Sequence, residues 1–174
     1  TQLRVAVWNA NSLLRKNSQA ACGLITKHDI TLIVETRCNK RAALPAPPGF
    51  DIQWLPSDRR NHGGHAIYIR SAPGRVTSVW RCGTHVLWVQ IVGIYPEPLF
   101  VGSIYAPPGE THYRPSFFED LLSDVTEAST LGRVLVAGDF NARTGNLSET
   151  SQDTEQLLAQ LGLWPAAHPD IGPR

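Results

Sequence analysis

The feature that most constrains this chain is a short apolar run that stops abruptly at an acidic residue. Residues 134–137 (Val-Leu-Val-Ala) are too short and too β-branched for a helix of their own, so they predict a buried strand. Gly138 then permits a turn or a close approach of the backbone. Asp139 and Asn141 stand two residues apart, which in an extended chain puts both side chains on one face. This pairing suits a site for water, metal or phosphate, and equally a turn whose polar groups bond only nearby backbone.

Three other predicted strands also run into polar residues. The first ends at Asn9 and Asn11. The second is continuously apolar and runs into Glu35, and the third stops at Tyr105. If the four strands are neighbours, these groups form one cluster on a rigid frame, where proteins commonly place catalytic side chains. Carboxylate and amide oxygens suit Mg²⁺, and a tyrosine hydroxyl can donate to a phosphate. In such a cluster Asp139 would take a proton from water while Glu35 holds the metal ion.

The order of the predicted elements indicates an α/β sandwich. Strands are predicted at residues 3–8, 30–34, 50–55, 65–70, 76–80, 86–92, 99–105 and 133–140, and helices at residues 14–28, 117–125 and 154–161. Ser116 and Asp153 are the predicted caps of the second and third helices. Strands outnumber helices and short turns join most of them, which favours two packed mixed sheets with helices outside over a regular doubly wound fold.

Composition limits the classes of protein that fit. With 174 residues, 42% of them apolar and 18% charged, the chain is expected to be one globular domain. The net charge of +1 gives no bulk electrostatic footprint for nucleic acid, so DNA binding would depend on a local site. Three scattered cysteines fit an intracellular protein with reduced thiols. No apolar run approaches the length of a membrane span, so no membrane partner is expected.

Four short motifs carry a resemblance to a known family. They are Trp-Asn-Ala-Asn-Ser-Leu at residues 8–13, Val-Glu-Thr-Arg at 34–37, Ser-Ile-Tyr-Ala-Pro-Pro at 103–108 and Gly-Asp-Phe-Asn-Ala at 138–142. Each is common by chance, but four in order, each ending an apolar strand, form a specific signal. Their order and spacing resemble the endonuclease/exonuclease/phosphatase superfamily. The chain is most similar to the apurinic-type endonuclease domain of non-LTR (LINE-type) retrotransposons, which implies a deoxyribonuclease-like sandwich.

The resemblance implies a metal site. Glu35 would bind the catalytic Mg²⁺, or Mn²⁺ in its place, and Asn9 would hold the metal-site region and the scissile phosphate. Asn11 occupies a position where many relatives have Asp. A neutral amide is a poorer ligand than a carboxylate, so this difference would weaken a second metal contact.

The resemblance also implies roles in the chemical step. Tyr105 would contact the phosphate or stabilise its transition state, and Asp139 would orient or deprotonate the attacking water. Asn141 would bond the phosphate. Arg37 and Arg143 are candidate contacts to the DNA, although a plain surface position explains Arg37 equally well.

The implied activity is Mg²⁺-dependent nicking of DNA, which would prime reverse transcription by a reverse transcriptase domain on the same parent polyprotein. Intracellular and nuclear localisation is expected. Family members continue beyond the last predicted helix with strands that carry an Asp-His segment, so we interpret residues 1–174 as a domain incomplete at its C-terminus and lacking its last strands. Two alternatives stay open: a catalytically inactive remnant that binds nucleic acid weakly, and a phosphomonoesterase or lipid phosphodiesterase of the same superfamily.

Overall fold

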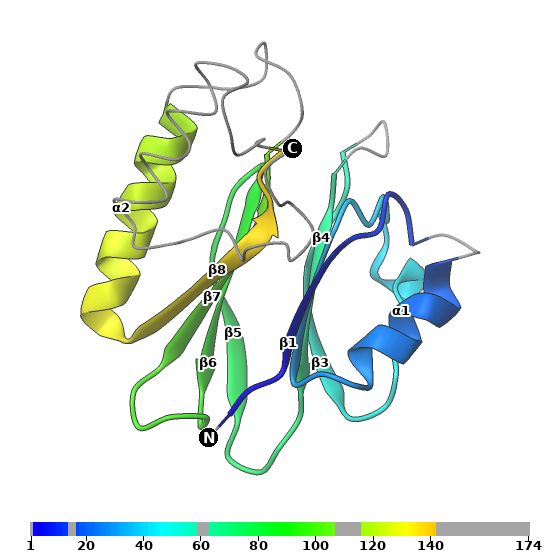
Figure 1. Cartoon of the computed structure of the whole chain (residues 1–174), viewed down its shortest axis with the longest axis horizontal. Helices are drawn as coiled ribbons and strands as arrows, with labels where there is room; N and C mark the ends of the chain where they lie inside the picture. The colour runs from blue at the N-terminus through cyan, green and yellow to red at the C-terminus, as the bar shows by residue number, and fades with distance from the viewer. Residues whose placement is uncertain (1, 14–16, 59–62, 107–115, 142–174) are drawn as a thin grey trace, which may run out of the picture.

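The protein is a four-layered sandwich in the computed structural model, which describes residues 2–13, 17–58, 63–106 and 116–141. Two sheets of four strands pack face to face, and one helix covers the outer face of each sheet (Figure 1). The predicted α/β sandwich of two mixed sheets is therefore confirmed. Within these residues no helix has both the length and the apolar character that a membrane crossing requires.

The first sheet has the strand order β1-β2-β4-β3. Strands β1 (Val5–Asn9) and β2 (Ile30–Val34) are parallel, and helix α1 (Ser18–Ile25) connects them across the outer face. Strands β3 (Phe50–Leu55) and β4 (His65–Arg70) pair antiparallel, and β4 also pairs antiparallel with β2. A parallel pair needs such a crossover because its connection must return to the starting edge.

The second sheet repeats this arrangement with the order β5-β6-β7-β8. Strands β5 (Val76–Cys82), β6 (Val86–Val92) and β7 (Leu99–Tyr105) form an antiparallel meander. Helix α2 (Ser116–Leu131) then crosses over, and β8 (Arg133–Asp139) pairs parallel with β7. Each sheet thus contributes one parallel pair joined by a helix.

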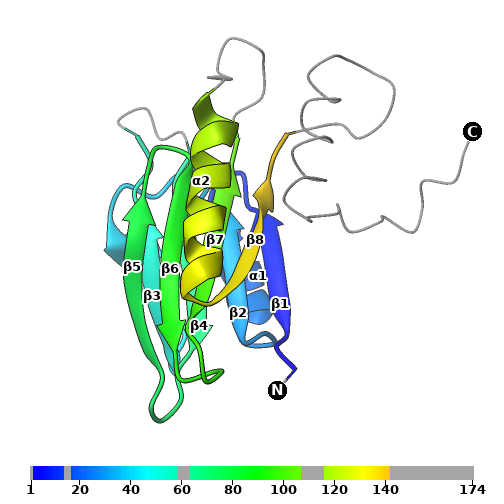
Figure 2. The same cartoon turned by 90° about the vertical axis from the view of Figure 1, so that its left-hand side faces the viewer.

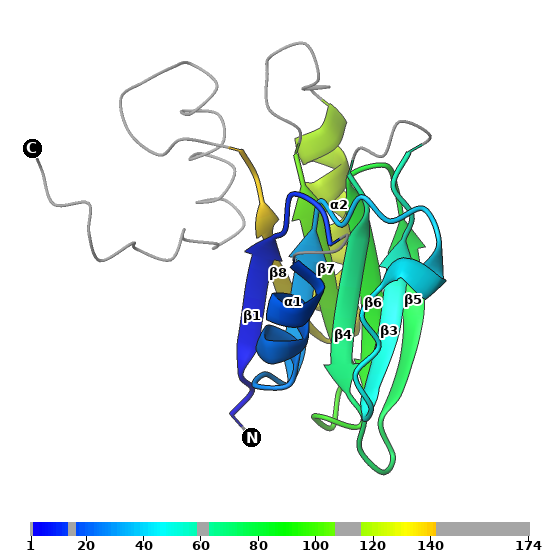
Figure 3. The ribbon, with the colours of Figure 1, turned by 90° about the vertical axis from the view of Figure 1, so that its right-hand side faces the viewer.

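The two parallel pairs bring four strand ends to one edge of the sandwich. The last residues of β1 and β2 lie in register, as do those of β7 and β8. Strands β1 and β8, one from each sheet, lie side by side in Figures 2 and 3 and are in contact. The carboxyl ends of β1, β2, β7 and β8 therefore meet at the same end of the molecule.

Apolar side chains fill the three interfaces between the four layers of the sandwich. One cluster lies between α1 and the first sheet, and another between α2 and the second sheet. The third cluster, between the two sheets, holds their spacing, and its fully buried members include Leu32, Ile67, Ile69, Val89 and Val101. Burial of apolar surface on this scale is the main stabilising contribution in a domain of this size.

Several predicted boundaries differ from the observed ones. The helix predicted at residues 14–28 is observed as α1, which begins at Ser18 and ends at Ile25. Residues 14–16 lie outside the described part. Helix α2 includes Ser116, which was predicted as its cap. The last strand ends at Asp139 rather than Phe140. The helix predicted at residues 154–161 also lies outside the described residues. A 3₁₀ helix, η2 (Arg41–Ala43), was not predicted.

One polar pair lies inside the layer between the sheets. Nδ1 of His65, on β4, is 3.1 Å from the hydroxyl oxygen of Ser103 on β7, and both residues are fully buried. Burial, assisted by the charge of nearby His85, lowers the pKa of His65 to about 3. The imidazole therefore stays neutral in the folded protein near pH 7 and links the two sheets through a hydrogen bond.

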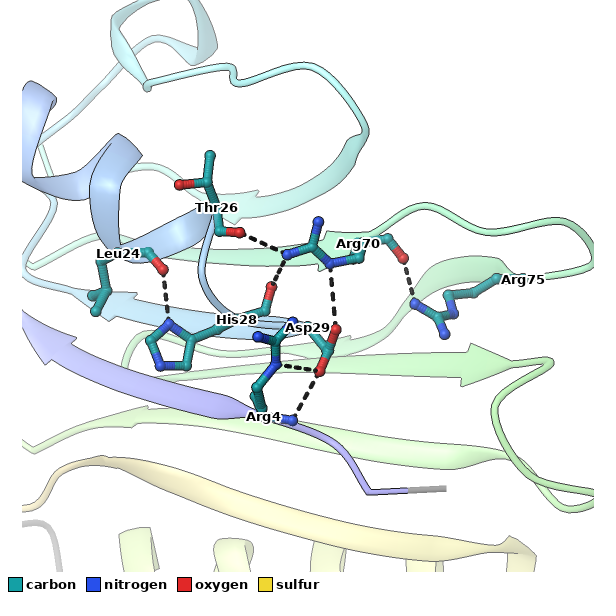
Figure 4. A network of polar contacts seen from close by, with 7 residues as sticks. All are labelled: Arg4, Leu24, Thr26, His28, Asp29, Arg70 and Arg75. Carbon is teal, nitrogen blue, oxygen red and sulfur yellow. Dashed lines mark hydrogen bonds and ion pairs between the residues drawn. The ribbon is translucent and has the colours of Figure 1, made fainter.

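A second polar network closes the opposite end of the first sheet (Figure 4). The Arg70 guanidinium donates to the carbonyl oxygens of Thr26, at 2.7 Å, and His28, at 3.0 Å, just beyond the end of α1. It also pairs with the carboxylate of Asp29 at 3.3 Å. The same carboxylate accepts the backbone N–H of Arg4, the main cause of its lowered pKa. Arg70 thus ties the end of β4 to the segment that joins α1 to β2.

We predict that stability depends on the neutral state of His65. The unfolded imidazole binds a proton near pH 6.5, whereas the folded one does so only near pH 3. Between these values the unfolded state holds more protons, so the free energy of unfolding should fall by about 1.4 kcal/mol per pH unit as the pH drops. Urea denaturation between pH 7 and pH 5 measures this. His65→Leu should remove this dependence and His28→Gln should keep it; equal slopes in all three proteins would contradict the prediction.

We also predict that Arg70→Ala lowers the free energy of unfolding by about 1–2 kcal/mol, because two carbonyl groups and a carboxylate lose a charged donor. Arg4→Ala is the matched control. Its side chain is 62% exposed, and the backbone N–H that bonds Asp29 remains in the variant. Chemical denaturation at pH 7 measures both changes. Equal losses in the two variants would show that the network adds nothing beyond surface charge pairing.

Candidate active site

The site is formed by two hydrogen bonds that cross from one sheet to the other. Asn9, at the end of β1, donates its amide N–H to Asp139 at the end of β8, with 2.7 Å between Nδ2 and Oδ2. Tyr105, at the end of β7, donates its hydroxyl to the carboxylate of Glu35, which directly follows β2. Residues far apart in the sequence thus form the single cluster that the strand ends predicted.

The chain turns immediately after Asp139. Asn141 has φ 47°, a left-handed conformation, and its backbone N–H donates to Oδ1 of Asp139 at 2.9 Å. Its side-chain amide donates to the carbonyl oxygen of Ala106 at 2.6 Å. The prediction that Asp139 and Asn141 share a strand face is therefore wrong, because the extended conformation ends at Asp139. The turn leaves both oxygens of Asp139 held by donors, which fixes the orientation of the carboxylate.

Gly138 allows the close approach expected at this position. A Cβ added there would lie 1.9 Å from the carbonyl oxygen of Ile104, its register partner on β7. Backbone atoms cannot move aside as a side chain would, so no larger residue fits without separating the strands. The glycine therefore lets β8 pair closely with β7 one residue before Asp139.

Three residues beside the cluster adopt left-handed backbone conformations: Asn11 (φ 44°), Glu35 (φ 53°) and Arg37 (φ 52°). Such conformations cost free energy in residues other than glycine and persist only where the surroundings hold them. Here the Glu35 carbonyl accepts the N–H of Ser12 at 2.8 Å, and the Arg37 N–H donates to the carbonyl of Gly63 at 3.0 Å. The glycine pair at residues 63–64, just before β4, thus supports this turn, a contact that no pattern in the sequence indicated.

One guanidinium nitrogen of Arg37 contacts two oxygen atoms of the site. Nη2 of Arg37 donates to Oδ1 of Asn11 and lies 3.5 Å from Oε2 of Glu35. The carboxylate and the amide oxygen therefore face a common point that already holds a positive charge. The Arg37 side chain is 40% exposed and that of Glu35 is 15% exposed, so this point is open to the surface.

The Glu35 carboxylate and the Asn11 amide oxygen are suitable ligands for a hard divalent cation. Carboxylate and amide oxygens are the ligands that Mg²⁺ prefers, and the guanidinium between them shows that the pair can surround a cation. Asn9 is less free, because its oxygen accepts the Asn11 N–H at 3.0 Å. In the part of the chain described here, no three His, Cys, Asp or Glu residues gather as a metal site. Mg²⁺ commonly uses only one or two carboxylates, with water and phosphate completing its coordination.

The environment of Tyr105 keeps its hydroxyl protonated. Burial is the largest cause of its raised pKa, followed by the hydrogen bond to Glu35 and the negative charges of Glu35 and Asp139. The positive charge of Arg37 opposes this shift only partly. Tyr105 is therefore a hydrogen-bond donor at neutral pH and not a base.

The structure brings together all but one of the predicted site residues. Asn9, Asn11, Glu35, Arg37, Tyr105, Asp139 and Asn141 are linked by the contacts above. Arg143 lies outside the described residues. Thr36 was not predicted; it is fully buried behind the Glu35 turn, where its N–H donates to the Gly64 carbonyl. Its place between two candidate residues was the only signal in the sequence.

Solved structures with this fold include AP endonucleases. The catalytic domain of Xenopus laevis APE2 has a TM-score of 0.68 at 16% identity, covering 91% of this chain and 67% of that one. The AP endonuclease LMAP from Leishmania major has a TM-score of 0.73 at 14% identity, covering 91% and 66%. Truncated Caenorhabditis elegans TDP2 has a TM-score of 0.59 at 17% identity, covering 84% and 66%.

This chain spans about two thirds of the length of these structures, and at such identities the likeness shows a shared fold. A search of curated proteins found no significant match. The family model described as "Endonuclease/Exonuclease/phosphatase family" matches residues 6–170, nearly the whole chain. The chain therefore belongs to the endonuclease/exonuclease/phosphatase family.

Proposed function

We propose that this domain is a divalent-metal-dependent phosphodiesterase that hydrolyses DNA. The observation that carries the proposal is the cluster formed by two cross-sheet hydrogen bonds, Asn9 to Asp139 and Tyr105 to Glu35. It combines an oriented carboxylate, a protonated hydroxyl and oxygen donors for a cation, which is the set that metal-assisted phosphate hydrolysis needs. Membership of a family of nucleases and phosphatases supports this chemistry.

Asp139 is suited to act on the attacking water. Its two oxygens are held by the Asn9 side chain and the Asn141 backbone, so the remaining lone pairs have a fixed direction. A carboxylate fixed in this way can orient a water molecule and accept its proton as the new P–O bond forms. The fixed direction avoids the entropic cost of orienting the base during reaction.

Tyr105 and Asn141 are suited to bind the phosphate. The Tyr105 hydroxyl is protonated and can pass its hydrogen bond from Glu35 to a phosphate oxygen. The Asn141 amide uses one N–H on the Ala106 carbonyl and has a second for substrate. Donors that meet the phosphate oxygens as charge develops on them lower the barrier to hydrolysis.

Glu35, with the oxygens of Asn9 and Asn11, would hold Mg²⁺ or Mn²⁺. The cation would offset the charge that develops on the phosphate. The family is generally dependent on divalent metals, and the donor set described above fits one. Asn11 contributes a neutral amide, so Glu35 supplies the main charge of the site.

DNA is the proposed substrate because the four sequence motifs resemble those of retrotransposon endonucleases, which nick a target strand. The structures with this fold include AP endonucleases, which supports a nucleic-acid phosphodiester as the substrate. A reverse transcriptase domain on the same parent polyprotein is the proposed partner. A substrate panel of plasmid DNA, a phosphomonoester and a phospholipid headgroup ester would separate the nuclease from the other activities of this family.

We predict that the chain converts supercoiled plasmid to the open circular form in Mg²⁺. EDTA should stop this by removing the cation, and Asp139→Asn should lower the rate by at least about 100-fold, because general acid–base groups contribute factors of about 10²–10⁴. Agarose electrophoresis over time measures the rate. Asp120→Asn, the same change on the exposed face of α2, is the matched control and should keep full activity.

Circular dichroism should show that all three proteins are folded. If the folded wild-type chain does not nick plasmid, the proposal fails for this chain. If Asp139→Asn nicks at the wild-type rate, Asp139 is not the group that acts on water. Hydrolysis of the phosphomonoester alone would assign the site to the phosphatase branch.

A further inference from the structure

Arg37 occupies the position in the candidate active site that a bound cation would need. Its Nη2 lies 3.5 Å from Oε2 of Glu35 and donates to Oδ1 of Asn11. The other carboxylate oxygen of Glu35 accepts the Tyr105 hydroxyl. Each Glu35 oxygen therefore already has a partner, and the oxygen that pairs with Arg37 is held by charge rather than by a neutral group.

We propose that Arg37 is an internal counter-ion that competes with the divalent cation for Glu35 and sets the affinity of the site for metal. The inference rests on the proposed function only in taking the Glu35 site to bind a divalent cation. A guanidinium and a metal ion cannot both contact the same face of one carboxylate without strong repulsion. The cation must displace the guanidinium from Oε2 to bind there.

The backbone and the exposure of Arg37 allow such a displacement. The backbone N–H of Arg37 donates to the Gly63 carbonyl, so the residue stays anchored while its side chain moves. The side chain is 40% exposed, which leaves it room to turn toward solvent. Release costs one charged pair and the bond to Asn11, and metal binding must offset that cost.

The neutral side chain at position 11 is consistent with this role. Asn11 gives Arg37 a carbonyl oxygen but no charge, so release of the guanidinium breaks one ion pair, to Glu35, and one hydrogen bond to a neutral group. Displacement also frees a positive charge at the rim of a site that would receive a phosphate. The Arg37 side chain would then have a phosphate oxygen as its new partner.

Isothermal titration with Mg²⁺ of the whole chain tests the inference without catalysis. Arg37→Gln should bind Mg²⁺ about three- to tenfold more tightly than the wild-type chain, because the competing charge is gone. Arg37→Asn is a second variant suited to the left-handed backbone at this position. Lys40→Gln removes one exposed charge from the same segment and should leave the affinity unchanged. Glu35→Gln should weaken binding, which identifies the titrated site.

A second measurement follows Arg37 directly. The side-chain Nε–H signal of Arg37, assigned by its loss in Arg37→Gln, should shift during the Mg²⁺ titration with the same midpoint as the calorimetric curve. An Arg37 signal that does not respond would overturn the inference. Equal or weaker Mg²⁺ binding by both Arg37 variants would also overturn it, as would equal tightening by Lys40→Gln.

The two proposals fail in different ways. If the wild-type chain and the Arg37 variants all fail to bind Mg²⁺, the metal-dependent function fails and the competition with it. If the wild-type chain binds Mg²⁺ and nicks DNA but Arg37→Gln has unchanged affinity, the proposed function stands and only the role of Arg37 is rejected.

Discussion

The apolar layer between the two sheets is the constraint on which the rest of the structure depends. It holds the end of β1 within hydrogen-bond distance of the end of β8, and the turn after β2 within reach of the end of β7. Neither sheet alone carries a complete site, because each cross-sheet pair takes one residue from each sheet. The buried hydrogen bond between His65 and Ser103 also joins the two sheets within this layer. It adds a directional contact to the apolar packing, which has no preferred direction.

The two helix crossovers explain why the polar ends coincide. A strand–helix–strand unit makes its two strands parallel, so both strands point their carboxyl ends the same way. Packing two such units face to face places four carboxyl ends at one edge (Figure 1). Open sheets commonly bind ligands at such edges, since loops there can vary while the frame stays rigid.

Strain and charge are both concentrated at this edge. Asn11, Glu35, Arg37 and Asn141 all have left-handed backbone conformations, and all of them contact the cluster. Backbone hydrogen bonds to neighbouring segments hold the conformations of Glu35 and Arg37. The backbone N–H groups of Asn11 and Asn141 donate instead to the side chains of Asn9 and Asp139. The same turns direct the Glu35 carboxylate and the Arg37 guanidinium toward each other, so the geometry that would hold a metal ion also holds its competitor.

The sequence alone determined the fold class, the approximate positions of the eight described strands and the polar residues that follow four of them, because buried strands show a local apolar pattern. It overestimated α1, because the helix ends at Ile25 and Thr26 and Lys27 form a turn. Only the tertiary structure decided how the polar residues meet. The turn at Asn141, the bridge from Arg37 to Glu35 and the pairing of His65 with Ser103 all join segments distant in sequence or depend on left-handed backbone. Contacts of that kind follow from packing, which no local pattern encodes.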